Sequence, residues 1–327
     1  MAHRRYPCHV WSEGISIYEQ GKRMQLGVQL PTGGALAGPA NIARVAKEAE
    51  RLGYHSVWTY ERLLRPMAEI SMFGAPPARI PETYRLTYEP LETLSYVAGM
   101  TDTIRLGTSV IDALLHPPIV LARRFATLDQ FSGGRVVAGL GQGWMPQEFE
   151  AANVPMKRMG AGMDEVVAAM RACWGPDPTQ YEGRFYRIEA AEVNPKPVQQ
   201  PIPVLFGSTT PAGIARAARI ADGLNPIAFS AEQLTGTAAT FRRLAAEAGR
   251  DAAALTVVAR ANVPLTDEPM GEGRPFLGGA PEQIAADIAG LEGSGVDTVL
   301  VASIRQTDID LELRLLDRLQ SAVAKLA

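Results

Sequence analysis

Cysteine is almost absent from this sequence of 327 residues, which contains only Cys8 and Cys173. The two cysteines form no CxxC pair and lack the spacing of metal ligands, so a disulfide scaffold and a zinc site are both disfavoured. We therefore expect no metal site. Such sparing use of cysteine is typical of a reducing compartment, and we expect a cytoplasmic protein.

Long apolar runs and clusters of positive charge are also missing. No apolar stretch approaches the roughly 20 residues that a membrane-spanning helix needs, and the first residues lack the apolar core of a secretory signal. The formal net charge is −3 and the lysines and arginines are scattered, which argues against a nucleic-acid partner. We expect neither a membrane nor a nucleic acid as partner, but a small-molecule substrate.

Histidine is scarce, with four residues that form no cluster. The HExxH and GxSxG motifs and the spacing of paired catalytic carboxylates are absent, so hydrolase and metal-dependent activities are disfavoured. His116 precedes Pro117, which predicts a role in helix entry rather than in catalysis.

What the sequence does contain is a regular alternation of strand and helix patterns. From Met24 onward, eight apolar segments are each followed by a helical pattern, or by a loop and then a helical pattern. This alternation predicts a parallel sheet, and eight such units over about 300 residues predict a closed (β/α)8 TIM barrel. A doubly wound open sheet is the alternative. The predicted strands are 24–30, 55–60, 104–111, 135–141, 204–206, 224–227, 255–263 and 297–302.

Residues 24–327 are predicted to form one barrel domain with insertions after strands 2, 4 and 7. The first insertion, 61–87, is rich in proline and long enough to act as a lid. The other two are 181–203 and 267–279. Residues 1–23 show no clear period, and we expect a disordered extension there. An arm that docks on a partner subunit is the alternative.

The segment Ile104–Trp144 is the most informative part of the chain. It predicts a strand, a helix and a second strand that carries Gly139 and Gly141 and leads to Gly143. Because side chains alternate along a strand, these glycines should share one face, against which a large flat group could lie. Tight packing inside a barrel is the alternative. The run does not match the dinucleotide fingerprint, because Trp144 stands where a third glycine is needed.

A second candidate site is the run Gly207-Ser208-Thr209-Thr210-Pro211, between the fifth strand and its helix. Thr210 suits the N-cap and Pro211 the first turn of that helix. The free amides and partial positive charge of a helix N-terminus attract phosphate, and three hydroxyls beside them would complete an anion-binding loop. A capping role for Thr210 without any ligand is the alternative.

Glu61 lies at the end of the second strand, in the run Thr59-Tyr60-Glu61-Arg62. Functional residues of such barrels lie at the carboxyl ends of the strands, where a carboxylate can bind a ring or move a proton. An ion pair between Glu61 and Arg62 at the barrel rim is the alternative.

Four runs, VWTYERLLRP, IRLGTSVI, SGGRVVAGLGQGW and PKPVQQPIPV, give the chain a wider likeness that extends from Met24 to Ala302. The chain resembles the bacterial luciferase-like monooxygenase superfamily, and within it the branch of oxidoreductases that use the deazaflavin coenzyme F420. The resemblance implies a homodimer that transfers hydride between F420 and a small organic substrate. Two alternatives stay open: a monooxygenase that uses reduced FMN from a separate reductase, and a barrel that binds a flavin without catalysis.

The resemblance also implies where the cofactor binds. The phosphate would lie at Gly207, Ser208, Thr209 and Thr210. The ring would lie edge-on at the strand ends, against a non-proline cis peptide between Ser109 and Val110. The residues implied to border the ring are Tyr60, Gly141, Gln142 and Gly143.

The chain departs from the superfamily pattern at the end of the second strand. Luciferases and sugar-phosphate dehydrogenases of the superfamily have a histidine there, whereas this chain has Tyr60-Glu61-Arg62. Glu61 is therefore the candidate to replace the histidine in proton transfer.

Overall fold

Eight parallel strands close into a barrel in the computed structural model, which describes residues 24–72 and 75–326. The expected extension 1–23 lies outside the described residues. The ring runs from β1 through β2, β3, β5, β8, β9, β10 and β11 back to β1, so the predicted (β/α)8 barrel is confirmed. The strands are β1 (Gln25–Gln29), β2 (Ser56–Thr59), β3 (Arg105–Thr108), β5 (Val136–Gly141), β8 (Val204–Phe206), β9 (Gly223–Leu224), β10 (Thr256–Val263) and β11 (Thr298–Ser303).

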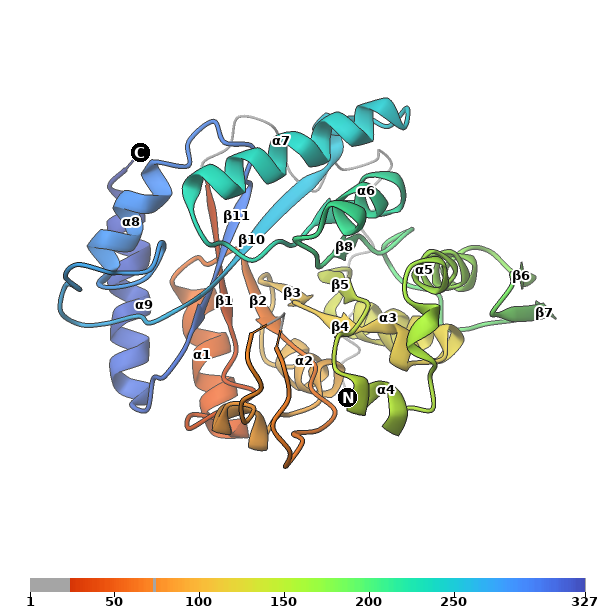
Figure 1. Cartoon of the computed structure of the whole chain (residues 1–327), viewed down its shortest axis with the longest axis horizontal. Coiled ribbons are helices and arrows are strands. Elements are labelled where there is room, and N and C mark those ends of the chain that lie inside the picture. The colour runs from red at the N-terminus through yellow and green to blue at the C-terminus, as the bar shows by residue number, and fades with distance from the viewer. Residues whose placement is uncertain (1–23, 73–74, 327) are drawn as a thin grey trace, which may run out of the picture.

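One long helix follows each barrel strand, and together these helices surround the sheet (Figure 1). Several begin with proline at the first turn, where the missing N–H has no partner to lose. The helices are α1 (Pro39–Arg51), α2 (Pro90–Ala98), α3 (Pro118–Ser132), α5 (Ala161–Trp174), α6 (Pro211–Ile220), α7 (Ala231–Glu247), α8 (Pro281–Ala289) and α9 (Ile309–Ala324).

Insertions follow the second, fourth and seventh barrel strands, as predicted. Residues 60–89 separate β2 from α2 and include a short 3-10 helix, Glu82–Arg85. After β5 the short helix α4 (Pro146–Ala151) precedes α5. The antiparallel hairpin of β6 (Thr179–Glu182) and β7 (Arg187–Ala191) then projects from the body of the molecule (Figure 1). The third insertion, 264–280, lies between β10 and α8.

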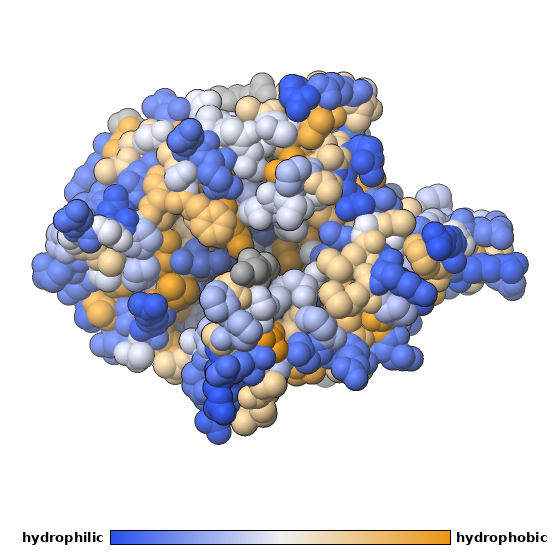
Figure 2. Space-filling model, in the orientation of Figure 1, coloured by the Kyte–Doolittle hydropathy of each residue, from blue (hydrophilic) through white to orange (hydrophobic). Residues whose placement is uncertain are grey.

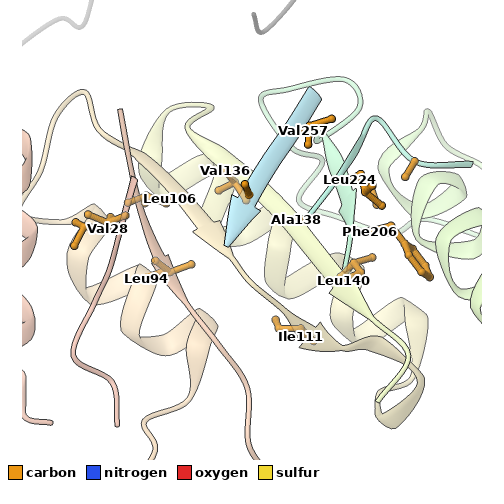
Figure 3. Packing of buried hydrophobic residues seen from close by; sticks show 14 of the residues in the cluster. Val28, Leu94, Leu106, Ile111, Val136, Ala138, Leu140, Phe206, Leu224 and Val257 are labelled. Atoms are coloured by element: carbon orange, nitrogen blue, oxygen red, sulfur yellow. The ribbon is translucent and has the colours of Figure 1, made fainter. Parts of the chain in front are cut away.

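Two separate hydrophobic clusters divide the core. The larger one joins the strands to the surrounding helices, and Val136, Ala138 and Leu140 belong to it at alternate positions of β5 (Figure 3). The smaller cluster takes one residue from each of five strands and none from a helix, so it fills the barrel interior. Its members are Trp58, Val137, Leu205, Val258 and Leu300.

Trp58 on β2 is the largest side chain of the interior cluster, and its indole requires glycine on both neighbouring strands. A Cβ atom at Gly107 on β3 would lie 2.3 Å from Trp58 Cε3, and one at Gly27 on β1 would lie 2.6 Å from Trp58 Nε1. The indole N–H donates to Ser56 Oγ at 2.8 Å, so its polar group is satisfied although it is buried.

The predicted strand 104–111 is not continuous. It forms β3 and then a two-residue strand, β4 (Ile111–Asp112). Gly107 pairs with Val137 of β5, and Ile111 pairs with Leu140. From residue 107 to 111 the chain advances four positions, while β5 advances only three, from 137 to 140. The extra residue forms a bulge that interrupts the strand.

Replacing Gly107 by alanine should lower the free energy of unfolding by about 1–3 kcal/mol, because the new methyl group would overlap the Trp58 ring. Urea denaturation monitored by circular dichroism measures the change. Gly236→Ala in α7 is the matched control: its Cβ would meet no atom within 4 Å, and the change should stabilise the helix by roughly 0.5–1 kcal/mol.

The cause can be isolated with a double-mutant cycle. In a Trp58→Leu background the Gly107→Ala change should cost much less, because the overlapping ring is gone. An equal cost in both backgrounds would show that steric overlap with Trp58 is not the reason for glycine at position 107.

Candidate functional site

A polar layer lies directly above the apolar interior, at the carboxyl ends of the strands. Inward side chains on one strand are two residues apart, so Val258 in the interior cluster is followed by Arg260. On β1, β2, β3 and β9 the residue two positions beyond an inward-facing one lies at the same level. These residues and Arg260 are called the mouth layer. Its members are Gln29, Tyr60, Ser109, Asn225 and Arg260.

The peptide bond between Ser109 and Val110 is cis, as the family resemblance implies. Neighbouring strand ends hold it through the backbone. The Ser109 N–H donates to the Thr59 carbonyl at 2.7 Å, and the Glu61 N–H donates to the Val110 carbonyl at 3.0 Å. The cis peptide is therefore a fixed part of the barrel mouth.

Side chains of the mouth layer connect this peptide to the opposite strands. The Ser109 hydroxyl donates to Asn225 Oδ1 at 2.5 Å, and Asn225 Nδ2 donates to the Val258 carbonyl at 2.7 Å. Arg260 Nη1 donates to the Ser109 carbonyl at 2.7 Å, and Nη2 donates to Gln29 Oε1. Burial lowers the pKa of Arg260 to about 10, so the guanidinium still carries its charge at neutral pH.

The bulge that contains the cis peptide depends on Gly139. The Thr108 hydroxyl donates to the Gly139 carbonyl at 2.7 Å and accepts from the Gly139 N–H at 3.0 Å. A Cβ atom at Gly139 would lie 1.7 Å from the Thr108 carbonyl oxygen. Any other residue at position 139 would therefore displace β3 from β5.

The other glycines also face protein atoms. The Val110 side chain fills the space that a Cβ would need at Gly141 and at Gly207, with contacts of 2.6 and 2.7 Å. Gly143 lies beyond the end of β5 with φ +79°, and its Cβ would meet Phe149 at 2.9 Å. The expectation of an open glycine face is therefore wrong, and the alternative of tight packing describes these positions. Cofactor contacts through Gly141 and Gly143 stay a prediction.

Two further predicted cofactor residues lie at the mouth. The Tyr60 ring lies 6.2 Å from the Tyr84 ring and 5.8 Å from Arg260 Cζ, and burial raises the pKa of its hydroxyl. Gln142 Oε1 accepts the Gly160 N–H at 2.6 Å, which ties the end of β5 to the start of α5. Gln142 is thus partly committed to a structural contact.

The loop Gly207–Thr210 closes against the first turn of α6. Thr210 is the N-cap, and its hydroxyl accepts the Gly213 N–H at 3.2 Å. The hydroxyls of Ser208 and Thr210 lie 3.2 Å apart, and a Cβ at Gly213 would lie 1.9 Å from Ser208 Oγ. Thr209 is exposed beside them. The capping role is confirmed, and an anion at this polar helix end is compatible with it.

Glu61 is 3 % exposed and pairs with residues that follow β3. Its Oε1 lies 2.7 Å from His116 Nε2, and its Oε2 accepts the Asp112 N–H at 2.8 Å. Arg62 instead forms its ion pair with Glu148 at 2.6 Å. The alternative of a Glu61–Arg62 pair is therefore wrong, and His116 does more than begin a helix.

Three buried acids lie together behind the mouth: Glu61, Asp112 and Glu148, hereafter the acidic cluster. Burial raises the pKa of Asp112 to about 7, and the charges of Glu61 and Glu148 add to this effect, whereas Arg62 opposes it. Burial also raises the pKa of Glu148. Asp112 is therefore partly protonated at neutral pH.

Sequence reasoning missed Gln29, Asn225 and Arg260, although a signal for them was present. Each is the inward position at the end of a strand, two residues beyond an inward residue of the same strand. Alternation of inward and outward side chains along every strand, and not only along the strand with Gly139, singles out these polar residues.

Figure 2 shows a hollow near the middle of one face of the molecule, with hydrophobic residues visible beside it. Within residues 24–72 and 75–326, no group of three or more His, Cys, Asp or Glu side chains could hold a metal ion. No helix in the described part of the chain is both long enough and apolar enough to cross a membrane.

A closed parallel barrel with a polar mouth at its strand ends defines the class of (β/α)8-barrel proteins that act at that end. Within this class, the chain belongs to the luciferase-like monooxygenase family, whose model matches residues 23–270. An uncharacterised protein of Mycobacterium tuberculosis is 35 % identical over 203 residues, 61 % of this chain and 71 % of that protein. An F420-dependent glucose-6-phosphate dehydrogenase of Nakamurella multipartita is 32 % identical over 189 residues, 57 % of this chain and 51 % of that protein.

Solved structures agree on the fold. A monooxygenase from Streptomyces bottropensis superposes with a TM-score of 0.75 at 23 % identity, covering 92 % of this chain and 99 % of the other. The coenzyme F420-dependent tetrahydromethanopterin reductase from Methanopyrus kandleri gives 0.74 at 19 % identity, covering 93 % and 99 %. Identities this low support the barrel and leave the chemistry open.

Replacing Asp112 by asparagine should flatten the pH dependence of stability. The pKa of Asp112 rises from 3.8 to about 7 on folding, so between these values the folded protein binds more protons than the unfolded chain. Stability then falls as pH rises through this window, by about 1.4 kcal/mol per pH unit for one group. Asparagine removes this slope but can still accept the Gly143 N–H that Asp112 accepts.

Urea unfolding across this pH window measures the slope. Glu312→Gln is the matched control, because burial also raises the pKa of Glu312 to about 7 on a different element, α9. It should remove a similar slope, and the two effects should add. A wild-type slope in the Asp112→Asn variant would show that Asp112 is ionised throughout.

Proposed function

We propose that this protein is an oxidoreductase that transfers hydride between coenzyme F420 and a small organic substrate at the barrel mouth. The observation that carries the proposal is the polar mouth layer at the strand ends, in which Arg260 donates to the Ser109 carbonyl and Asn225 accepts the Ser109 hydroxyl. The family resemblance implies that the cofactor ring binds against this peptide. The F420-dependent dehydrogenase that is 32 % identical to this chain adds support for the cofactor.

The residues present fit a flat ring that carries a phosphate. Ser109 and Val110 would support the ring, and the α6 N-terminus with Ser208, Thr209 and Thr210 would bind the phosphate. Thr210 already caps the helix, so the hydroxyl of exposed Thr209 and the amides of the first turn are the groups offered to an anion. A bound deazaflavin supplies the hydride chemistry.

The chain's own residues would orient the reactants and exclude water. Tyr60, Gly141, Gln142 and Gly143 would border the ring. Holding two reactants in alignment can lower a barrier by about 7–11 kcal/mol. A site of this kind needs little acid–base machinery.

Glu61 is our candidate for proton transfer. Its carboxylate contacts His116 directly, and Asp112 follows in the same acidic cluster. A proton could pass between Glu61 and His116 over 2.7 Å. We therefore assign His116 as the partner that exchanges the proton with Glu61.

A monooxygenase that uses reduced FMN from a separate reductase is the second candidate, favoured by the description of the matching family. A barrel that binds a flavin without catalysis is the third. We further propose a homodimer in the cytoplasm, supplied with reduced cofactor by a flavin or F420 reductase.

Titration of the purified protein with F420 should quench its tryptophan fluorescence, whereas FMN should bind at least tenfold more weakly. Trp144, whose ring lies 5.4 Å from Arg62 Cζ at the edge of the site, is the expected reporter. Thr209→Glu should weaken F420 binding at least tenfold, because the new carboxylate repels the phosphate. It should leave stability equal or higher, because acids near a helix N-terminus are favourable by about 0.3–1 kcal/mol.

Thr235→Glu provides the matched control, because it adds the same charge at an exposed position of α7. Tight binding of FMN with none of F420 would reverse the order of the two cofactors. If Thr209→Glu binds F420 as tightly as wild type, the phosphate does not bind at the α6 N-terminus.

Glu61→Gln should lower kcat by about 10²–10⁴-fold if Glu61 moves the proton, with F420 affinity unchanged. The glutamine oxygen can still accept the Asp112 N–H, which preserves the loop. Activity is followed by the absorbance of F420 with a panel of small alcohols, aldehydes and ketones. Activity within a few-fold of wild type, with an unaltered pH profile, would reduce Glu61 to a structural residue.

A further inference from the structure

Arg260 lies over the middle of the barrel. It is on β10, two residues beyond Val258 in the interior cluster, and its guanidinium reaches the carbonyl of Ser109 after β3 and the side chain of Gln29 at the end of β1. Its Cζ lies 5.8 Å from the centre of the Tyr60 ring, after β2. One side chain thus touches the ends of three other strands.

This cation is held by uncharged acceptors. Its three hydrogen bonds go to the Ser109 carbonyl, to Gln29 Oε1 and to Asn262 Oδ1, the last at 2.8 Å. Within residues 24–72 and 75–326, no carboxylate forms an ion pair with it. Several other half-buried arginines do have such a partner: Arg171 with Asp222 at 2.9 Å, Arg242 with Asp297 at 3.1 Å and Arg274 with Asp287 at 2.6 Å. Arg135 shows no ion pair within the described residues either, but it makes five hydrogen bonds to uncharged oxygens, two more than Arg260.

A cation that is largely removed from water and lacks a counter-charge destabilises the folded protein. The cost is visible in Arg260, whose pKa burial lowers to about 10. A guanidinium has five N–H groups, and hydrogen bonds to described residues account for three. The mouth layer therefore contains a charged group with two N–H donors left over for a further ligand.

We propose that Arg260 is a substrate-recognition residue and that the substrate is a small organic anion whose oxyanion group pairs with the guanidinium. The inference rests on the proposed function, because it places a substrate in the mouth beside the cofactor. The planar guanidinium matches a carboxylate or similar oxyanion in two-point geometry. A neutral isostere leaves the cation without compensation, and this difference creates the selectivity.

Isothermal titration calorimetry tests the inference with matched pairs of anion and neutral isostere, benzoate with benzamide and acetate with acetamide. Each pair is titrated into the protein with and without F420. Wild-type protein should bind the better anion at least tenfold more tightly than its amide. Arg260→Gln should lose this preference, with anion binding weakened at least tenfold more than amide binding or F420 binding. Arg260→Lys should keep the preference at reduced size, because the charge remains and the fork is lost.

Arg243→Gln is the matched control, because it removes the same charge from an exposed position of α7. Its anion preference should equal that of wild type. The inference is overturned if wild type shows no preference in either pair, or if Arg260→Gln retains it. It is also overturned if Arg260→Gln weakens anion, amide and F420 alike, because Arg260 then only holds the Ser109 peptide in place.

The Arg260→Lys variant decides the matter if Arg260→Gln does not fold: weaker anion binding with unchanged amide binding supports recognition, and equal losses overturn it. Failure of the proposed function has a different signature. A protein that binds neither F420 nor FMN, but still prefers the anion through Arg260, would refute the cofactor and leave this inference standing.

Discussion

The contact between Thr108 and Gly139 is the constraint on which the barrel mouth depends. The two residues exchange hydrogen bonds at 2.7 and 3.0 Å, and no side chain fits between them. This close approach lets β3 carry one residue more than β5 and still rejoin it at β4. The extra length exposes the Ser109–Val110 peptide at the strand ends, where Val110 packs against the glycines of two neighbouring strands. The site is thus built by a local mismatch of strand lengths.

Charge is distributed unevenly around this mouth. Behind it, Arg62, backbone amides and His116 contact the acidic cluster, and the remaining repulsion and burial raise the pKa of Asp112. Across it, the hydrogen bonds of Arg260 to described residues go to carbonyl and amide oxygens. The buried acids therefore have a cationic partner in Arg62, whereas Arg260 has no carboxylate partner among the described residues. If the proposed roles hold, this asymmetry places proton transfer and ligand recognition on different strands.

Local patterns predicted the architecture well because the periodicity of strands and helices depends on residues that are close in the sequence. The strand 204–206 was predicted with its observed limits. Long-range contacts were not accessible in the same way. Glu61 meets His116 rather than Arg62, its neighbour in sequence. Arg260 contacts Ser109 from a position 151 residues away. Glycine spacing indicated close contact on β5, but whether a ligand or another strand fills the space depends on packing that no single segment encodes.

The indole of Trp58 has a consequence for how this barrel can evolve. Because it occupies volume above both Gly27 and Gly107, three adjacent strands share one fixed space, and a larger residue at either glycine is tolerable only with a smaller one at position 58. The three positions should therefore covary as a unit among homologues. The residues of the mouth layer lie two positions beyond this unit on each of its strands. They can therefore change during evolution while Gly27, Trp58 and Gly107 stay the same.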